Sequence, residues 1–404
     1  MKNTLYGDGI HDDTAAIQEM IDTSTHGLEL PMPRDKYIIS KPLELPSDFC
    51  LTLPRYAEIK LAAGSDCVML KNKTVDDYKK RLGKHLRVGW FVNCYPPDFK
   101  CHNIKLFGGI WNFNNKEQTA NPMQDPNADW SKNYSGLGIL FYGVDGLHIS
   151  DITLKDPVTF GLILDTVNDF TIENIIFDYN YGNPIAVNMD GVHIDGNCHR
   201  GVIKNLKGAC YDDMVALNAD EGSDGPISDI EIDGIYALDS HSAVRLLTVK
   251  HRLSNVHIRN VYGTYYQYCI GFTKYYEGET TGCFDSISID HIYASKAFRR
   301  PEFEQHMHGW DFHFPLIYFT DGTKSDNITI DTVHRCESVN PIETICIDEK
   351  ALVNRLSLRN ITVENLTDKH IAKFLNRGIV KKLYVSEMES GDIENNGSIE
   401  NLVL

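Results

Sequence analysis

The chain lacks an excess of positive charge. Its 404 residues carry 39 lysines and arginines against 56 acidic residues, which gives a formal net charge of −17 at pH 7. Binding to nucleic acid or to an anionic membrane needs a basic face, so this balance argues against both kinds of partner. It leaves room for a local basic pocket that takes an anionic substrate.

Long apolar runs and cysteine motifs are also missing. No segment approaches the ~20 apolar residues that span a bilayer, and the first residues contain no apolar core of a secretory signal. The ten cysteines form no CxxC pair, which excludes zinc ribbons and thioredoxin-like sites and is typical of a reducing compartment. The sequence therefore predicts a cytoplasmic protein, or a secreted one if a signal peptide has been removed.

What the chain has in quantity is a short repeated pattern, apolar–x–apolar–x–(Asn, Asp or Gly)–apolar. Alternation with period two indicates a strand with one buried face, and the polar or glycine residue after it marks a bend. The steps between successive copies are uneven, which indicates insertions between some of them. The copies are centred on Leu106, Ile149, Ile172, Ile203, Ile232, Ile258, Ile289, Ile330, Leu358 and Val385.

Most of these copies recur after about 25–30 residues, a spacing that is typical of a solenoid. No copy keeps a helical period, which excludes helical repeats, and propeller blades of ~40–45 residues are too long for most steps. The sequence therefore predicts an all-β fold, a single-stranded right-handed parallel β-helix. We expect one domain over residues 1–404, with regular coils over about 100–390 and loop insertions at 111–140 and 294–325.

A short helix is predicted near the N-terminus, within a cap region of about residues 1–30. Ile17, Met20 and Ile21 fall on one helical face, and Asp13 or Thr14 can start the helix. Because the open end of a solenoid exposes its core, we expect this helix to cover it. The surrounding stretch GDGIHDDT is accordingly interpreted as structural.

Three aspartates are separated by the length of one short coil. Asp212 and Asp213 follow Asp190 at that distance along the chain, so the three are expected on neighbouring coils. In the strand that follows, Asp213 falls on the inward phase and Asp212 on the outward phase. Carboxylates so close together repel, so one should hold a proton. A protonated acid beside a carboxylate is what glycoside hydrolysis needs; aspartates that cap turns, or a calcium site, are the alternatives.

These residues resemble the motifs of the polygalacturonase family, family 28 of the glycoside hydrolases, which are right-handed parallel β-helix enzymes. The family's Asn-Thr-Asp-Gly and Gly-Asp-Asp are similar to NMDG (188–191) and YDD (211–213). Its Gly-His-Gly and Arg-Ile-Lys stand where this chain has SHS (240–242) and FTK (272–274). The aspartates and the histidine are kept, whereas Phe272 replaces the arginine.

The resemblance implies a role for each of the residues that are kept. Asp212 would be the general acid, Asp190 and Asp213 would activate a water molecule, and His241 would assist the acid. Water needs room between acid and base, so the implied outcome is inversion at the anomeric carbon. No cofactor and no metal are implied.

The resemblance also implies a uronate-containing carbohydrate as substrate, with Asn188 and Lys274 as binding residues. Arg245 is a candidate for the anion contact that Phe272 cannot make. Sugar rings stack on aromatic side chains, so one or two of the tyrosines over 262–276 are expected to contact substrate, with Tyr275 as the candidate. His308, in the insertion FRRPEFEQHMHGWDFHF, is expected in a groove wall; with His306, Asp311 and His313 it also has spacings that a metal site could use.

Two other functions stay open. A polysaccharide lyase would use the same fold with calcium and a basic residue. A phage tailspike that binds or depolymerises glycans would be trimeric. The oligomeric state expected from the sequence is therefore a monomer or a homo-oligomer, a trimer included.

Overall fold

The computed structural model describes residues 4–73, 91–92, 99–120, 136–183, 188–275, 278–298 and 313–404. The chain divides into two units. The N-terminal unit consists of Met1–Val202 with Cys210–Asp212 and Glu221–Asp224, and the C-terminal unit of Ile203–Ala209, Asp213–Asp220 and Gly225–Leu404. Each unit is described by itself below.

The N-terminal unit begins with a helix and continues with strands, most of them short. Its described elements are α1 (Thr14–Thr23), β1 (Gly27–Glu29), β2 (Tyr37–Ile39), β3 (Leu43–Leu45), β4 (Phe49–Thr52), β5 (Glu58–Leu61), β6 (Leu70–Asn72), β7 (Phe91–Val92), β8 (Cys101–Phe107), β9 (Ile110–Asn112), the 3-10 turn η1 (Asn115–Glu117), β10 (Ile139–Ser150), β11 (Thr153–Lys155), β12 (Leu162–Asp178), β13 (Val192–Ile194), β16 (Gly222–Ser223) and the start of β14 (His199–Gly208).

The C-terminal unit continues with strands of two kinds, long ones that alternate with short ones through most of it. They are β15 (Asp213–Asn218), β17 (Ile227–Ser240), β18 (Ser242–Leu247), β19 (Arg252–Tyr265), β20 (Ile270–Thr273), β21 (Cys283–Lys296), β22 (Ile317–Phe319), β23 (Lys324–Glu337), β24 (Ile345–Ile347), β25 (Leu352–Asn365), β26 (Phe374–Asn376), β27 (Ile379–Ser386), the 3-10 turn η5 (Ser390–Asp392), β28 (Ile393–Asn395) and β29 (Ser398–Val403).

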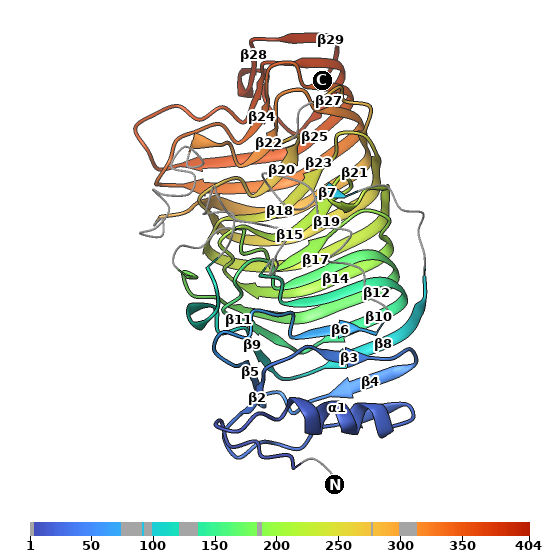
Figure 1. Cartoon of the computed structure of the whole chain (residues 1–404). Coiled ribbons are helices and arrows are strands. Elements are labelled where there is room, and N and C mark those ends of the chain that lie inside the picture. The colour runs from blue at the N-terminus through green and yellow to red at the C-terminus, as the bar shows by residue number, and fades with distance from the viewer. Residues whose placement is uncertain are drawn as a thin grey trace. The chain divides into compact units, whose positions relative to one another are not determined.

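In both units, strands pair in parallel with the equivalent strand one coil away, and the fold is a right-handed parallel β-helix, as predicted (Figure 1). The repeat anchors of the sequence lie directly opposite one another. Ile149 pairs with Leu106 and with Ile172 in the N-terminal unit. In the C-terminal unit the unbroken column of paired anchors is Ile232, Ile258, Ile289, Ile330, Leu358 and Val385.

The polar residue of each repeat is explained by the corners of the coil. In β19 the chain turns at Asn255 and Asn260, whose φ angles are 53° and 58°. Asparagine tolerates this left-handed conformation better than most residues because its short side chain bonds locally. Asn260 Nδ2 donates to Asp233 Oδ1 at 2.7 Å, one coil away. The left-handed backbone at the corner and the hydrogen bond between coils together explain why the repeated pattern contains Asn and Asp.

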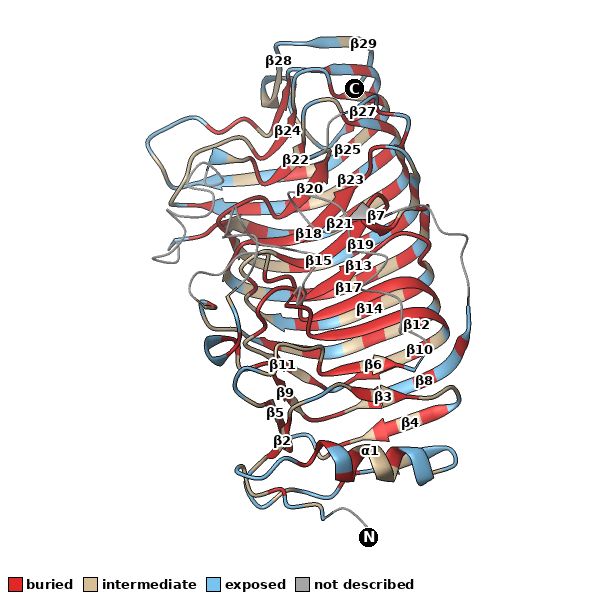
Figure 2. Cartoon of the chain, viewed as in Figure 1, coloured by how far each residue is buried: buried red, intermediate tan, exposed pale blue. Residues whose placement is uncertain are grey.

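The core lies inside the coils. Figure 2 shows buried and exposed residues alternating along the strands, as period two requires. In β25, for example, Leu356 and Leu358 are fully buried, whereas Arg355 and Arg359 beside them are exposed.

The coils extend beyond the predicted limits. Strands β1 to β6 already form paired coils, with Gly27 opposite Cys50 and Tyr37 opposite Ile59. Within the insertion predicted at 294–325, β22 pairs with β20 and so belongs to the stack. Strands as short as these carry too little alternation to be recognised in a sequence, which explains both differences.

The predicted helix is α1, and its Ile17 and Ile21 are fully buried. Its N-cap is Asp13, but the side chain that accepts a bond from the first turn is that of Asp12, 2.8 Å from the Thr14 amide. In the described part of the chain, no helix has the length and apolarity needed to cross a membrane.

Asp13 holds the preceding loop instead. Its buried carboxylate accepts the amide of Tyr6 at 2.6 Å and that of Gly7 at 3.1 Å. Asp13→Ala is expected to destabilise the fold by about 1–3 kcal/mol, because both amides lose their acceptor. Urea unfolding tests this, with the exposed Asp35→Ala as control; equal midpoints for the two variants would contradict it.

Candidate functional site

In the N-terminal unit, the backbone around Asp190 is fixed by the previous coil. The Asp190 carbonyl accepts bonds from the Gly161 amide at 2.9 Å and the Tyr179 hydroxyl at 3.1 Å. Asn188, two positions earlier, is half-buried with a φ angle of 51°. Asp190 itself is fully buried. The predicted base and the predicted substrate residue thus lie on one short turn before β13.

The Asp190 side chain points to His193, which is not among the predicted site residues. Its Oδ2 lies 2.6 Å from Nδ1 of His193, and Nε2 of the same ring faces Asp195 and Glu221. All four residues are buried, and His193, Asp195 and Glu221 place potential ligand atoms within 4.8 Å of one another, so they could hold a metal ion. The available signal was a histidine at a strand position between two apolar residues.

Asp212, the predicted general acid, is half-buried and follows Tyr211. The Tyr211 ring packs edge-on against Tyr181, with 5.4 Å between ring centroids. Burial raises the pKa of Tyr211, with a smaller contribution from Tyr181, so its hydroxyl stays neutral. The proximity of Asp190 to Asp212 and Asp213 stays a prediction.

In the C-terminal unit, Asp213 begins β15 and is fully buried. It pairs in register with Ser242 one coil on, and the Ser242 hydroxyl donates to its Oδ1. Its Oδ2 lies 2.8 Å from Nε of Arg245. A buried carboxylate with a guanidinium partner is favoured in its ionised form.

Two further predicted residues lie beside this ion pair. His241 is buried, and a ring nitrogen lies within 4.8 Å of a carboxylate oxygen of Asp213. The guanidinium carbon of Arg245 is 5.6 Å from the ring centroid of the exposed Tyr275. The Tyr275 hydroxyl in turn bonds that of Tyr268 at 3.1 Å. The C-terminal unit therefore brings together Asp213, His241, Arg245 and Tyr275.

The remaining predicted binding residues have other surroundings. Lys274 is half-buried, and its Nζ donates to the Gly278 carbonyl at 2.7 Å. Phe272 is a core residue, stacked on Phe319 with ring centroids 4.1 Å apart, so it does not reach the surface where an arginine could act. His308, with His306 and Asp311, lies outside the described residues.

The tyrosines of the segment 262–276 differ in exposure. Tyr265, Tyr266 and Tyr268 are buried. A methyl group on Gly271 would lie 2.5 Å from the Tyr268 ring, so this ring occupies the outer face of β20. Of the described tyrosines near Lys274, Tyr275 alone combines exposure with contact to Arg245, and Tyr276 is not among the described residues.

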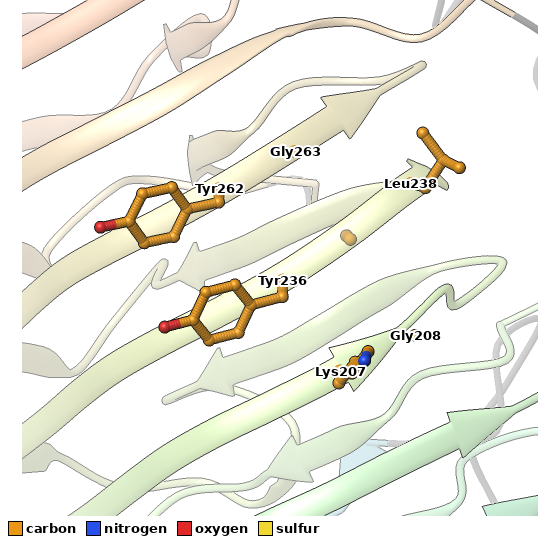
Figure 3. Close-up of a pocket in the computed structure, with 7 residues that line it drawn as sticks. Lys207, Gly208, Tyr236, Leu238, Tyr262 and Gly263 are labelled. Carbon is orange, nitrogen blue, oxygen red and sulfur yellow. The ribbon is translucent and has the colours of Figure 1, made fainter.

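Tyr262 lies elsewhere, half-buried between the exposed rings of Tyr236 and Tyr293. It is parallel to Tyr236 and to Tyr293, at 5.2 and 5.3 Å between centroids. An open hollow of about 470 Å³ adjoins this stack (Figure 3). Its lining comes from three neighbouring coils of the C-terminal unit: Lys207, Gly208, Tyr236, Ala237, Leu238, Tyr262 and Gly263.

A second carboxylate–histidine contact occupies the turn after β18. Burial by itself raises the pKa of Asp220, but bonds from His251 at 2.6 Å and from the Val249 and Lys250 amides outweigh it and lower the pKa to about 2. A depressed carboxylate pKa stabilises the fold above the unfolded value near 4, and this stabilisation disappears as the pH falls toward 2.

Asp220→Asn should therefore cost about 2 kcal/mol at pH 6 and less at pH 3, because at pH 3 the carboxyl group of the unfolded wild-type chain takes up a proton, which favours unfolding. Urea midpoints at the two pH values measure the difference. Asp321 is exposed, and Asp321→Asn serves as the control, which should leave the urea midpoint unchanged at both pH values. A cost for Asp220→Asn that is equal at pH 6 and pH 3 would contradict the assignment.

No family model matches the chain, and no curated protein sequence does. Solved structures of similar fold include the endo-xylogalacturonan hydrolase of Aspergillus tubingensis, with 13% identity, a TM-score of 0.59 and coverage of 98% of this chain and 99% of the other. The exopolygalacturonase of Thermotoga maritima has 14% identity and a TM-score of 0.56, and the match covers 97% of this chain and 90% of the other. A tailspike mutant of E. coli bacteriophage HK620 has 10% identity and a TM-score of 0.62, and the match covers 98% of this chain and 76% of the tailspike chain. At these identities the likeness is one of fold alone.

Proposed function

We propose that the protein is a glycoside hydrolase of the polygalacturonase type, acting with inversion on a uronate-containing poly- or oligosaccharide. The observation that carries the proposal is the buried Asp213, held by Arg245 and Ser242 with His241 close by. A carboxylate in this setting is ionised and can accept a proton from water. The spacing of Asp190, Asp212 and Asp213 along the chain also supports the proposal.

In the proposed reaction, Asp212 gives its proton to the glycosidic oxygen as the bond to the anomeric carbon breaks. Asp190 and Asp213 take a proton from the water that attacks the opposite face of the sugar. The general acid loses one proton and the general base gains one in each turnover, so the protons balance. His241 assists Asp212, whose proton must be restored before the next cycle.

Substrate would be held by the residues around these carboxylates. Tyr275 offers an exposed aromatic ring on which a sugar can stack. Lys274 and Arg245 bring positive charge for a uronate, although the Nε of Arg245 faces Asp213. Asn188 and His308 complete the proposed set as hydrogen-bonding residues.

The stereochemistry of the product tests this mechanism. Proton NMR of the first product formed should show the anomer opposite to that of the cleaved bond, and the reaction should proceed in EDTA. Retention of configuration would contradict the inverting mechanism. A new absorbance from unsaturated ends would indicate a lyase instead. Binding without cleavage by an SDS-resistant trimer would favour a tailspike-like function.

A further inference from the structure

A second hollow, polar in its lining, lies among the loops that precede the short strands of the C-terminal unit. Its volume is about 550 Å³. Two of these loops, 338–344 before β24 and 366–373 before β26, supply most of its lining. The charged and histidine side chains that line this polar hollow are His313, Glu343, Lys369, His370, Arg377 and Glu394. Because such side chains donate and accept hydrogen bonds, the polar hollow suits a polar ligand.

The polar hollow lies on the same side of the coils as His241. His241 stands directly before β18, and β18 pairs with β15, which begins at Asp213. From β18 onward the short strands pair in parallel in the order β20, β22, β24, β26 and β28. Parallel strands are about 4.8 Å apart, so the two loops lie about 14 to 19 Å from His241 along the stack. An oligosaccharide of several units that lies along the coils spans this distance.

One wall of the polar hollow is held from inside the fold. The buried Arg335 donates from Nη2 to the Asn340 carbonyl at 2.9 Å and from Nη1 to the Ile342 carbonyl at 2.7 Å. The Thr344 amide donates to the Ala372 carbonyl at 2.9 Å, which ties this wall to the next loop. These bonds fix the wall before a ligand arrives, so binding does not incur the cost of ordering it.

The next loop holds Lys369 by its backbone and leaves its side chain free. The Lys369 carbonyl accepts a bond from Asn365 Nδ2 at 2.7 Å, and its amide donates to Thr367 Oγ1 at 3.3 Å. Lys369 is exposed, and its Nζ has no hydrogen bond or ion pair with any residue that the structure describes. An ammonium group that lines a hollow without a partner is available to an anion.

The other charges of the polar hollow are paired with one another. Arg377 Nη2 lies 2.8 Å from Glu343 Oε1, and His370 Nε2 lies 2.8 Å from Glu394 Oε1. All four side chains are partly open to solvent. A sugar hydroxyl both donates and accepts a hydrogen bond, so pairs of this kind suit the hydroxyls of a sugar ring. Lys369 adds an unpaired positive charge in a chain whose formal net charge is −17.

We propose that the polar hollow is a distal subsite for an acidic sugar unit of the glycan. Lys369 contacts the carboxylate of the sugar, and the pairs Arg377–Glu343 and His370–Glu394 contact its hydroxyls. A uronate combines the negative charge and the hydroxyl groups that this lining binds. The inference rests on the proposed function, because that function makes a uronate-containing glycan the substrate. It makes Lys369 a specificity-determining residue several coils away from the proposed catalytic residues.

Calorimetric titration of the full chain tests the role of the charge, in the Asp212→Asn background to prevent cleavage. The probes are a hexagalacturonate and its methyl ester, which has the same sugar rings without the negative charges. Lys369→Gln should raise Kd for the acid about tenfold, the usual effect of losing one hydrogen bond to a charged group. Kd for the ester should not change. Lys369→Arg keeps the charge and should bind both probes as its parent does. An equal loss of affinity for the two probes would overturn the proposal.

Lys350→Gln is the matched control. Lys350 is also an exposed lysine of the C-terminal unit, but it follows β24 instead of preceding it and pairs with Asp321 at 3.4 Å. This variant should bind the hexagalacturonate with the Kd of its parent. A tenfold rise in Lys350→Gln as well would show that the total positive charge, and not the polar hollow, sets the affinity, and it would overturn the proposal.

The length of the substrate tests the distance from the proposed catalytic residues. In the chain that keeps Asp212, Lys369→Gln should raise KM for cleavage of the hexasaccharide about tenfold, with kcat changed less than about twofold. A disaccharide is too short to extend from His241 to the polar hollow, so neither constant should change with it. An equal effect on both lengths would overturn the assignment of a distal subsite.

The outcomes separate this subsite from the reaction itself. If the wild type cleaves a uronate-containing glycan and Lys369→Gln binds the hexagalacturonate as its parent does, the inference is wrong and the proposed function stands. If the wild type cleaves no glycan but binds the hexagalacturonate with the expected dependence on Lys369, the polar hollow is confirmed as a uronate site and the proposed reaction is wrong. Cleavage of neutral glycans alone, without binding of the hexagalacturonate, would overturn the subsite and the proposed substrate together.

Discussion

Replacing Arg335 by alanine is expected to lower the free energy of unfolding by about 3–5 kcal/mol. Arg335 and Glu337 are both fully buried, and the guanidinium donates to Glu337 Oε2 from Nε at 2.9 Å and from Nη2 at 2.7 Å. Two further bonds go to the carbonyls of Ile342 and Asn340. Alanine would leave a buried carboxylate without its cation.

The expected loss is large because Glu337 also organises the turn that follows β23. Its Oε1 accepts the amides of Val339 and Asn340 at 2.9 and 2.8 Å, and its Oε2 the amide of Lys296 at 3.1 Å. If Glu337 is protonated or displaced in the Arg335 variant, these bonds weaken together. Stability in a solenoid is carried between neighbouring coils, so this loss should spread to the adjacent coil.

Arg359→Ala is the matched control. Arg359 is also an arginine on a strand of the C-terminal unit, but its side chain is 57% exposed and its carboxylate partners, Asp331 and Glu387, lie at 3.7 and 3.3 Å. Exposed pairs contribute about 0–1 kcal/mol. Urea unfolding of both variants measures the contrast, and similar losses would show that burial of the Arg335 pair does not matter.

Asp212→Asn is expected to reduce the rate of glycan hydrolysis by a factor of about 10²–10⁴, which is the usual contribution of general acid catalysis. Asparagine has nearly the same shape but cannot give a proton to the leaving oxygen. Because Asp212 is half-buried and not part of the core, the circular dichroism spectrum and the unfolding midpoint should stay close to those of the wild type.

Asp178→Asn is the control for this variant. Asp178 ends β12, and its exposed carboxylate pairs with Lys155 at 2.6 Å. It should keep wild-type activity. Full activity in Asp212→Asn, or an equal loss in both variants, would remove Asp212 from the role of general acid.

The coils could be read from the sequence because their signal is repeated and local. Each anchor, such as Ile258 or Ile289, occupies an inward position in a long strand, and the register places successive anchors directly opposite each other. The N-terminal helix was recognisable for the same reason, since Ile17 and Ile21 mark one face. Short strands such as β22 are too brief to show a period.

The side-chain partners could not be read in the same way. Arg245 meets Asp213 from the strand one coil on, and Glu221 meets His193 from a separate segment of the chain. Such contacts depend on which loop folds over which strand, and no local pattern encodes that choice. The motif comparison placed Phe272 at a binding position, but alternation along β20 turns it into the core.

The most direct test of the central claim is to incubate the protein in EDTA with a panel of pectic and other glycans, recording reducing ends and absorbance near the unsaturated-uronate band. The proposed inverting hydrolysis predicts new reducing ends with the wild type, on a uronate-containing glycan, without new absorbance. New absorbance would contradict hydrolysis and indicate a lyase. Binding to a glycan of the panel with no new ends would contradict the claim that this β-helix is an enzyme.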